Sequence, residues 1–484
     1  MPDILHLEKY KENNRIEAKK SKGGLPKSVW ETYSSFANTQ GGVILLGVEE
    51  LPDKSLSAVG IDNADEIIKN FWDIVNNANK VSVNILSDKN VKTETVDGKA
   101  VIVITVPRAV RSDRPVYING NPMNGTYRRN GEGDYKCSSE EVRAMLRDAS
   151  VQSQDMLVLE NMGLDVFDFD SVHRYRQRMV SHRPGHVWEE LDDKDFLYKL
   201  GALGRGSNGE LRPTAAGLLM FGFDYEIVKE YPNYFLDYQE KFDESKRWTD
   251  RIASGTGEWN GNIYDFYFKV YNKLTQNIKI PFELDKGSRV EDTDIHKALR
   301  EAIANCLINA DYYGRQGIVI VQSSLEINIS NPGGFRVELE AAKAGGVSDP
   351  RNATLMKFFN LIGISERAGS GIQNIYSVWK KQGFDEPLLC EETEPERTIM
   401  KLFTEKVGDK KSAIKIGDKK SAINEEKKQQ IIDYLMKNGK AKTSEIADLL
   451  GLQSSRTRDY LNALVDEGKI IADGENKNRV YRLK

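Results

Sequence analysis

Two glutamates and a lysine lie close together near the N-terminus and could take part in binding a divalent cation. Glu12 and Glu17 are five residues apart, and Lys19 follows Glu17 by two residues. In a strand, Glu17 and Lys19 would point to the same side because side chains alternate, so Glu12 must come from a preceding turn or helix. Glu49, just after the next apolar run, supplies a further carboxylate. Such a group can bind metal and activate water against a phosphodiester, although a solvated charged surface is the simpler interpretation of the spacing alone.

An acid and two amides, each one helical turn apart, form a second candidate site. The segment 294–314 predicts an amphipathic helix that carries Glu301, Asn305 and Asn309 on one face. Polar side chains on an otherwise apolar helix are costly to bury without partners. A glutamate in this place could orient an attacking water, and an asparagine could hold Mg²⁺ on a triphosphate.

Two glycine-containing segments downstream could contact the rest of a nucleotide. Asn331 precedes Gly333 and Gly334, in a turn whose backbone can approach a flat ring or a ribose. Gly369 and Gly371 stand at an expected helix start, where free N–H groups favour phosphate. Together with the polar face of the preceding helix, these segments indicate a site for a nucleotide with Mg²⁺.

The C-terminal segment, residues 425–484, predicts three helices followed by a hairpin, which is the order of a winged helix. In such folds the second helix of the helix-turn-helix lies in the major groove, where glutamine can pair with adenine and arginine with guanine or phosphate. The candidate nucleic-acid contacts in this helix and in the wing are Gln453, Ser455, Arg456, Arg458, Lys477 and Arg479. A winged helix used for protein contact is the alternative.

The elements that would position these residues form an α+β multidomain protein. Apolar runs at 43–50 and 100–107 predict strands, and the segment 25–42 predicts a helix that ends at a pair of glycines. The expected divisions are an α/β domain (1–150), a helical or mixed connecting region (151–284), a second α/β domain (285–404), a basic linker with a short repeat (405–424) and a winged helix (425–484).

Composition and charge indicate a cytoplasmic protein that meets a polyanion. No run of roughly 18 apolar residues occurs, which excludes a membrane-spanning segment, and the polar N-terminus lacks the apolar centre of a secretory signal. The three cysteines are far apart and form no CxxC pair, so neither a disulfide framework nor a zinc site is expected. From Glu405 onward, 18 Lys and Arg face 13 Asp and Glu, whereas the rest of the chain is acidic, so a polyanion would bind through the C-terminus.

The segments EAIANCLINADY, ISNPGGF and RNATLMKFFNLIGISERAGSGI resemble, in order and spacing, a divergent GHKL-type ATPase domain that is often labelled RecG-related. The resemblance implies an α/β sandwich with a Bergerat-type ATP site, in which Glu301 activates water and Asn305 binds Mg²⁺. It departs from the family at Asn331, which stands where an aspartate usually holds the adenine amino group. An amide fits adenine less well, which favours nucleotide binding over rapid hydrolysis. A degenerate domain kept for structure or dimerisation is the alternative.

The segment ENNRIEAKKSKGGLPKSVWETYSSFANTQGGVILLGVEE resembles the Schlafen AlbA-type domain. The resemblance implies that Glu12 and Glu17 correspond to the cutting glutamates of Schlafen ribonucleases, with Glu49 in the place of a family aspartate. It also implies that YRRN, with Arg128 and Arg129, could meet phosphates. Many bacterial proteins with this domain are regulators without demonstrated cleavage, so nucleic-acid binding and nuclease activity both stay open.

The sequence thus predicts an ATP-responsive, DNA-binding transcriptional regulator. A divalent-metal-dependent nuclease, for example a defence effector, is the main alternative, and a scaffold with both sites inactive is a third. ATP and Mg²⁺ are the expected cofactors, and a second divalent metal site is expected only for a nuclease. DNA is the expected partner, with RNA as a second option, and the chain is expected to form a homo-oligomer because GHKL-type domains commonly dimerise and winged helices usually read paired half-sites.

Overall fold

A computed structural model describes most of the chain, which divides into two compact units. Unit 1 comprises residues 1–381 and 386–404, and unit 2 comprises residues 382–385 and 405–484. The described residues are 13, 15–243, 245–278, 284–285, 288–289, 292–365, 369–393, 395–404, 428–450, 457, 460–461, 464, 469–473 and 480–483. No helix among them is long and apolar enough to cross a membrane.

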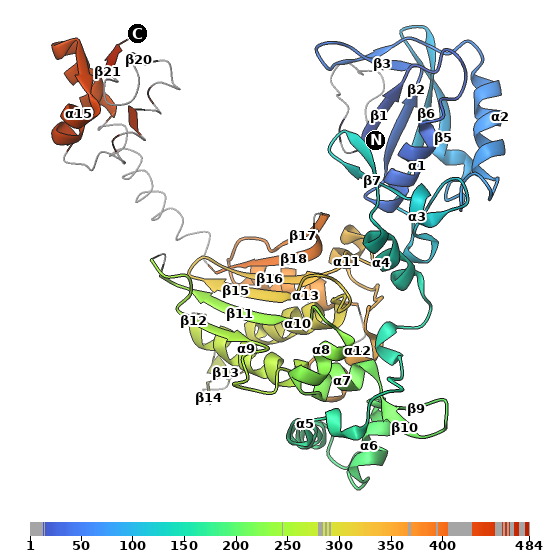
Figure 1. Ribbon diagram of the computed structural model, residues 1–484, viewed down its shortest axis with the longest axis vertical. Coiled ribbons are helices and arrows are strands. Elements are labelled where there is room, and N and C mark those ends of the chain that lie inside the picture. The colour runs from blue at the N-terminus through green and yellow to red at the C-terminus, as the bar shows by residue number, and fades with distance from the viewer. Residues whose placement is uncertain are drawn as a thin grey trace. The chain divides into compact units, whose positions relative to one another are not determined.

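Unit 1 begins with a four-stranded sheet in the order β1-β2-β6-β5 (Figure 1). β1 runs parallel to β2, and the other neighbours are antiparallel. The strands are β1 (Ile16–Lys19), β2 (Gly42–Leu46), β5 (Val91–Val96) and β6 (Lys99–Val106). The expected strand over 100–107 is confirmed as β6, whereas the run 43–50 is divided at Gly47 into β2 and a second strand, β3 (Val48–Glu50).

Both faces of this sheet are covered, as its two central, nearly continuously apolar strands β2 and β6 require. Helices α1 (Val29–Asn38) and α2 (Ala64–Val75) bury Tyr33, Phe36 and Phe71 against one face. The pair of β3 with β4 (Leu56–Ala58) packs on the other face. A hairpin of β7 (Tyr127–Asn130) and β8 (Gly133–Lys136) lies against α1. The short α3 (Pro122–Gly125) and the helix α4 (Ser139–Ala149) complete this N-terminal domain.

The region from 151 to 235 contains helices and one strand pair. Its elements are α5 (Phe169–His182), α6 (Asp193–Leu200), the strand pair β9 (Leu203–Arg205) with β10 (Leu211–Pro213), α7 (Ala215–Phe221) and α8 (Asp224–Glu230). Every residue of α7 is buried, because its small and apolar side chains face neighbours on all sides.

A six-stranded sheet with the order β12-β11-β15-β16-β18-β17 forms the second α/β domain. Its strands are β11 (Leu236–Lys241), β12 (Asp250–Ala253), β15 (Ile318–Ser323), β16 (Glu326–Pro332), β17 (Leu388–Thr393) and β18 (Glu396–Phe403). Two of them, β11 and β12, precede residue 285, because β11 pairs in parallel with β15 across a long separation in sequence. The sheet therefore extends N-terminal to the predicted boundary.

Helices cover one face of this sheet (Figure 1). α10 contacts β16 directly and also packs against its helical neighbours. The helices are α9 (Ile263–Asn277), α10 (Asp294–Asn309), α11 (Leu339–Ala344), α12 (Ala353–Leu361) and α13 (Gly371–Lys381), and a short pair of β13 (Leu284–Asp285) and β14 (Ser288–Arg289) lies between α9 and α10 in sequence. The predicted apolar stripe of α10 is confirmed, since Ile295, Leu299, Ile303 and Leu307 are fully buried.

The described residues of unit 2 include two of the three predicted helices and the predicted hairpin of a winged helix. Residues 428–438 are helical, α15 (Thr443–Leu450) follows, and β20 (Ile470–Asp473) pairs antiparallel with β21 (Val480–Leu483). A third strand, β19 (Lys440–Lys442), pairs with β21 and was not predicted. Ile431, Leu435, Ile446, Leu464 and Tyr481 belong to one buried core.

Candidate functional site

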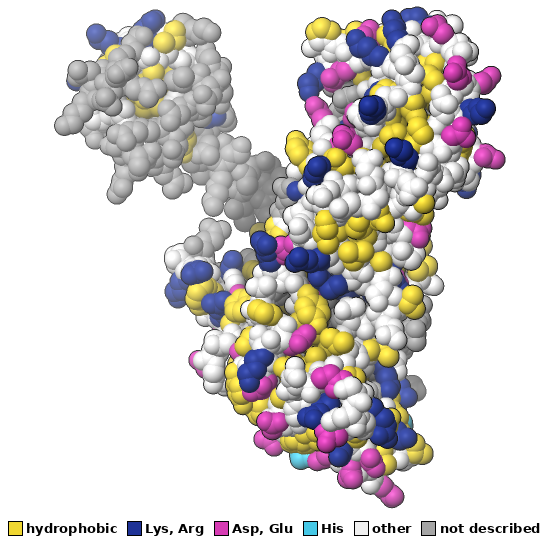
Figure 2. All heavy atoms as spheres, turned by 45° about the vertical axis from the view of Figure 1, so that its right-hand side comes forward, with side chains coloured by type: hydrophobic (Ala, Val, Ile, Leu, Met, Phe, Trp, Pro, Cys, Tyr) yellow, Lys and Arg dark blue, Asp and Glu magenta, His cyan; other side chains and the backbone are white. Residues whose placement is uncertain are grey.

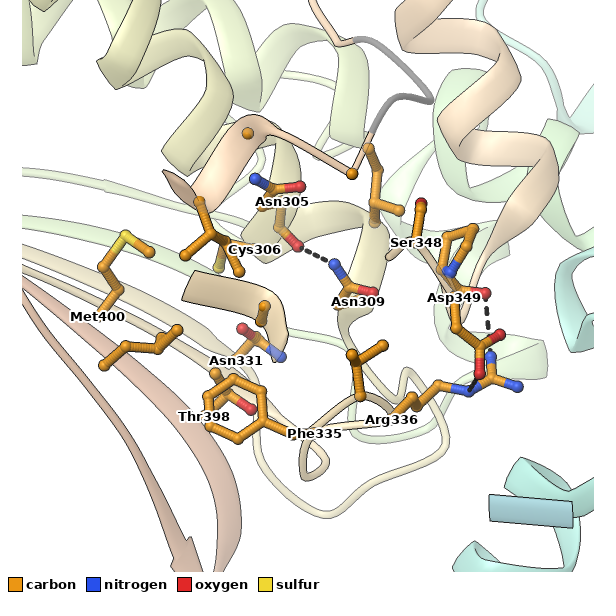
Figure 3. Close-up of a pocket in the computed structure, with 18 of the residues that line it drawn as sticks. Asn305, Cys306, Asn309, Asn331, Phe335, Arg336, Ser348, Asp349, Thr398 and Met400 are labelled. Atoms are coloured by element: carbon orange, nitrogen blue, oxygen red, sulfur yellow. Dashed lines mark hydrogen bonds and ion pairs between the residues drawn. The ribbon is translucent and has the colours of Figure 1, made fainter. Parts of the chain in front are cut away.

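A cavity in unit 1 lies between α10, the start of α13, the strands β16 and β18, and the loop before α12 (Figure 3). Its lining includes most of the residues that the sequence singled out for nucleotide binding, namely Glu301, Asn305, Asn309, Asn331, Gly334, Gly369 and Gly371. Gly333 lies next to this lining and packs on Arg351 instead. The structure thus brings together residues that are as much as 70 positions apart in the sequence.

The polar face of α10 forms one wall of the cavity. The Asn305 side-chain amide donates to Glu301 Oε1 at 3.2 Å, and the Asn309 amide donates to the Asn305 carbonyl at 3.0 Å. Because the opposite face of α10 is buried in the core, the helix cannot rotate and these groups stay directed at the cavity. The wall offers carboxylate and amide oxygens, the ligand types that Mg²⁺ prefers.

The first turn of α13 meets this polar wall without a side chain between them. A Cβ on Gly371 would lie 2.0 Å from Glu301 Oε1, so only glycine allows the present approach. Gly369 has a positive φ of 67° and also lines the cavity. A helix start stripped of side chains exposes backbone N–H groups, which together with the helix dipole favour an anion.

The opposite end of the cavity is mainly apolar and holds one buried amide. Asn331, on β16, is 4% exposed, and its side chain donates to the Pro332 carbonyl at 3.2 Å. It pairs in register with Thr398 on β18, whose hydroxyl donates to the Gly333 carbonyl at 3.0 Å. Figure 3 shows Asn331 and Thr398 close to Met400 and Phe335. A flat heteroaromatic ring suits this end, because it can pack on apolar groups while its edge meets an amide.

The turn after β16 is fixed by a buried arginine that the sequence analysis did not single out. Arg351 donates to the carbonyl groups of Asn309 at 3.1 Å and Gly334 at 3.0 Å. Gly333 has a φ of 91°, and a Cβ there would lie 1.6 Å from Arg351 Nη1, so glycine is required on both grounds. Gly333 therefore contributes to the site by admitting Arg351.

Asp148, from the end of α4, neutralises Arg351. The guanidinium donates to the two carboxylate oxygens of Asp148 at 2.9 and 2.7 Å. Burial raises the pKa of the Asp148 carboxyl, but the charge and hydrogen bonds of Arg351 outweigh burial and hold this pKa below its usual range. The only sequence signal for Arg351 was its place just after a Gly-Gly-containing loop and a proline, which does not reveal a partner 203 residues away.

The N-terminal candidate residues Glu17 and Lys19 lie side by side on β1, as the alternation of side chains predicts. Lys19 Nζ donates to Glu17 Oε1 at 2.8 Å, and Arg129 Nη2 donates to Glu17 Oε2 at 2.8 Å. Arg129 also donates to Asp134 at 2.9 Å, and its guanidinium lies 5.2 Å from the centre of the Phe36 ring. Glu17 thus belongs to a partly buried ionic cluster that ties β1 to the β7–β8 hairpin.

The two arginines that were expected to meet phosphates, Arg128 and Arg129, both pair with carboxylates of the N-terminal domain. The side chain of Arg129 is only 1% exposed because it is drawn inward by Glu17 and Asp134. Arg128 is 19% exposed and forms an ion pair with Glu141 at 2.8 Å. On the face that Figure 2 shows, Lys and Arg side chains of the N-terminal domain are interspersed with Asp and Glu.

Glu49 pairs with a different lysine from the one that pairs with Glu17. Glu49 pairs with Lys20 at 2.6 Å, and the hydrogen bond from Lys20 lowers the pKa of its carboxyl. Glu12 lies outside the residues that the structure describes. Within the described part of the chain, no group of three or more His, Cys, Asp or Glu side chains is placed to hold a metal ion.

Replacing Glu17 with glutamine is expected to lower the free energy of unfolding by about 1–3 kcal/mol, because buried Arg129 loses one of its two carboxylate partners. Chemical denaturation followed by tryptophan fluorescence measures this, since Trp30 and Trp72 pack in the same domain. Glu132, which forms an exposed ion pair with Lys54, is replaced by glutamine as the control. Equal stability of both variants would contradict the structural role of Glu17.

The predicted DNA contacts of the winged helix lie outside the described residues. These are Gln453, Ser455, Arg456, Arg458, Lys477 and Arg479. The described residues of unit 2 supply the core and the two paired strands that would carry the wing.

Comparisons with known proteins match four parts of the chain. Family models match as Schlafen, AlbA_2 over residues 12–138, as a domain of unknown function (DUF8451) over 143–237, as "Putative ATP-dependent DNA helicase recG C-terminal" over 318–400, and as a winged helix-turn-helix DNA-binding domain over 425–471. Three of them confirm the predicted architecture. No curated protein matches the chain.

Two solved structures are similar to parts or all of the chain. The crystal structure of the DIP2311 protein from Corynebacterium diphtheriae is 16% identical, with 97% of this chain and 95% of that chain covered and a TM-score of 0.40. The solution structure of the N-terminal domain of a putative ATP-dependent DNA helicase RecG-related protein from Nitrosomonas europaea is 32% identical, with 28% of this chain and 91% of that chain covered and a TM-score of 0.22.

Proposed function

The chain joins a Schlafen AlbA_2 domain, a domain of the RecG C-terminal type and a winged helix-turn-helix, and on this premise we propose that it is a DNA-binding transcriptional regulator that responds to ATP. The observation that carries the proposal is the cavity lined by Glu301, Asn305, Asn331 and the start of α13. A nucleotide bound there would favour one conformation of the domain that lies, along the chain, between the two nucleic-acid-binding domains.

The chemistry of the cavity fits ATP with Mg²⁺. Asn331 and the apolar side chains around it suit the adenine, and the N–H groups at the start of α13 suit the phosphates. Asn305, beside Glu301, offers a hard oxygen ligand for Mg²⁺. A bound Mg²⁺ would neutralise phosphate charge. Glu301 and Asn305 line the same cavity from one helix whose opposite face is buried, so their place on the wall is fixed.

Binding is proposed as the main event, with slow hydrolysis at most. Asn331 is an amide at the position where the related domains have an aspartate that hydrogen-bonds the adenine amino group. The adenine is therefore bound more weakly. Glu301 is the candidate base for water activation, and its carboxylate already accepts a hydrogen bond from Asn305. The main role of Glu301 is therefore to form part of the polar wall together with Asn305.

DNA would be bound through the winged helix of a homo-oligomer. Paired half-sites require paired recognition helices, and an arginine in the recognition helix supplies direct base or phosphate contacts. In a gel-shift experiment on genomic fragments upstream of the gene, we expect Mg²⁺-ATP to change the affinity of the wild-type chain several-fold. Arg456→Ala is expected to abolish the shift at matched protein concentration. A shift that is unaffected by both ATP and Arg456→Ala would contradict the proposal.

The same samples test the nuclease alternative. The Glu17 carboxylate is already shared by Lys19 and Arg129, which supports a structural role over metal binding. We therefore expect single- and double-stranded DNA and RNA to stay intact with Mg²⁺ or Mn²⁺, with and without ATP. Cleavage by the wild type that disappears in folded Glu17→Gln would instead show that the chain is a nuclease.

A further inference from the structure

The turn after β16, which forms part of the cavity wall, is held from outside its own domain by an arginine of the N-terminal domain. Arg108, just beyond β6, donates to the two carboxylate oxygens of Glu391 at 2.8 and 2.9 Å and to the Phe335 carbonyl at 3.3 Å. Glu391 Oε1 in turn accepts from the Phe335 backbone N–H at 2.6 Å. Arg108 and Glu391 are only 13% and 10% exposed, so water competes little with this arrangement.

A second connection fixes the loop before α12. Arg111 forms an ion pair with Asp349, which lines the cavity, and donates to the carbonyl groups of Asp148 at 2.7 Å and Ser150 at 3.0 Å. Arg336, another lining residue, lies 3.8 Å from the same Asp349 carboxylate. Figure 3 shows Arg336 and Asp349 facing each other at one end of the cavity.

The third connection is the Asp148–Arg351 pair, which joins the end of α4 to the Gly334 carbonyl. Three residues of the N-terminal domain, Arg108 and Arg111 after β6 and Asp148 at the end of α4, thus bond to backbone or side chains within residues 334–351. By contrast, the opposite walls are formed by α10 and β18, which are elements of the second α/β domain. The wall made of residues 334–337 and 347–350 is therefore the part of the cavity whose position depends on the N-terminal domain.

We propose that Arg108 is a positioning residue for the nucleotide, through which the N-terminal domain completes the cavity and is coupled to its occupancy. The inference rests on the proposed nucleotide site and adds the route of its regulation. Arg108 acts through Glu391 and Phe335 and does not itself line the cavity. Because coupling between two sites is reciprocal, a ligand on the N-terminal domain changes nucleotide affinity by the same factor as the nucleotide changes affinity for that ligand.

Two measurements on the full chain test this inference. Titration of Mg²⁺-ATP should show an affinity about tenfold weaker in Arg108→Gln than in wild type, with a smaller loss in Arg108→Lys, which keeps the charge. Lys54→Gln removes an exposed ion pair of the same domain and serves as the matched control, with unchanged affinity. Hydrogen exchange of the wild type provides an independent arm, in which Mg²⁺-ATP should slow exchange in peptides covering 108–114 as well as 333–351.

The outcomes separate this inference from the proposed function. Tight ATP binding by the wild type and equally tight binding by folded Arg108→Gln would overturn the inference and leave the nucleotide site standing. ATP protection confined to 333–351, without any change at 108–114, would overturn it as well, even if Arg108→Gln failed to fold. Absence of ATP binding by the wild type would remove the proposed function and this inference with it.

Discussion

Replacing Arg351 with methionine is expected to lower the free energy of unfolding of unit 1 by about 3 kcal/mol. The guanidinium is buried and makes five hydrogen bonds, two to the Asp148 carboxylate and three to the carbonyl groups of Asn309, Pro332 and Gly334. Methionine fills the volume of the arginine stem but supplies no donor, so a partly buried carboxylate loses its counter-charge. Tryptophan fluorescence during chemical denaturation reports this unit selectively, because all six tryptophans lie between residues 30 and 379.

A double-mutant cycle with Asp148→Asn identifies the cause. If the uncompensated charge dominates, Arg351→Met with Asp148→Asn should be more stable than Arg351→Met alone. The exposed Arg315, replaced by methionine, serves as the control for loss of a surface ion pair. A single variant as stable as the control, or a double variant no better than the single one, would contradict the assigned role of Arg351.

The pH dependence of stability follows from the same pair. Since the folded-state pKa of Asp148 lies below its ordinary value of 3.8, ionised Asp148 stabilises the fold above that value. This contribution should be lost as the pH falls through the lower folded-state pKa. Asp148→Asn removes the titrating group, so its stability should depend less on pH in this acidic window.

Replacing Gly371 with alanine is expected to weaken Mg²⁺-ATP binding by about 100-fold, equivalent to about 2.7 kcal/mol. The new Cβ would lie 2.0 Å from Glu301 Oε1 and 2.7 Å from its Cδ, so either Glu301 or the first turn of α13 must move. Both movements act on groups proposed to face the phosphates. The rest of α13 is anchored by buried Ile375 and Trp379, so the fold should persist.

Gly23→Ala is the matched control for the Gly371 variant. Gly23 has open space around its Cβ position and an ordinary φ, so nucleotide affinity should equal that of the wild type. Isothermal titration gives the affinities, and near-ultraviolet circular dichroism checks the fold. An unchanged affinity in Gly371→Ala would show that the start of α13 does not contact the nucleotide.

The sequence was sufficient to find the local parts of the site. Glu301, Asn305 and Asn309 were predicted on one face because helical periodicity is a local property, and the turn with Gly333 and Gly334 carried its own signal. The β20–β21 hairpin was predicted for the same reason. The resemblances then supplied what spacing alone could not, namely which chemistry these residues serve.

What the sequence could not reveal are pairings between distant segments. Arg108 and Glu391 are 283 residues apart, and Arg351 and Asp148 are 203 apart, so no window of sequence contains both members of either pair. The same limit explains the late predicted start of the second α/β domain, since β11 joins the sheet only through β15. It also explains Arg129, which was expected to meet phosphates and instead pairs with Glu17, 112 residues away.

Calorimetric titration of the purified chain with ATP, in the presence of Mg²⁺ and then of EDTA, decides whether the chain binds a nucleotide with Mg²⁺. We expect saturable binding of one ATP per chain, which weakens when Mg²⁺ is removed and which Asn305→Leu reduces to the level seen in EDTA. Binding that ignores both Mg²⁺ and Asn305, or no binding at millimolar ATP, would contradict the nucleotide-responsive regulator proposed here.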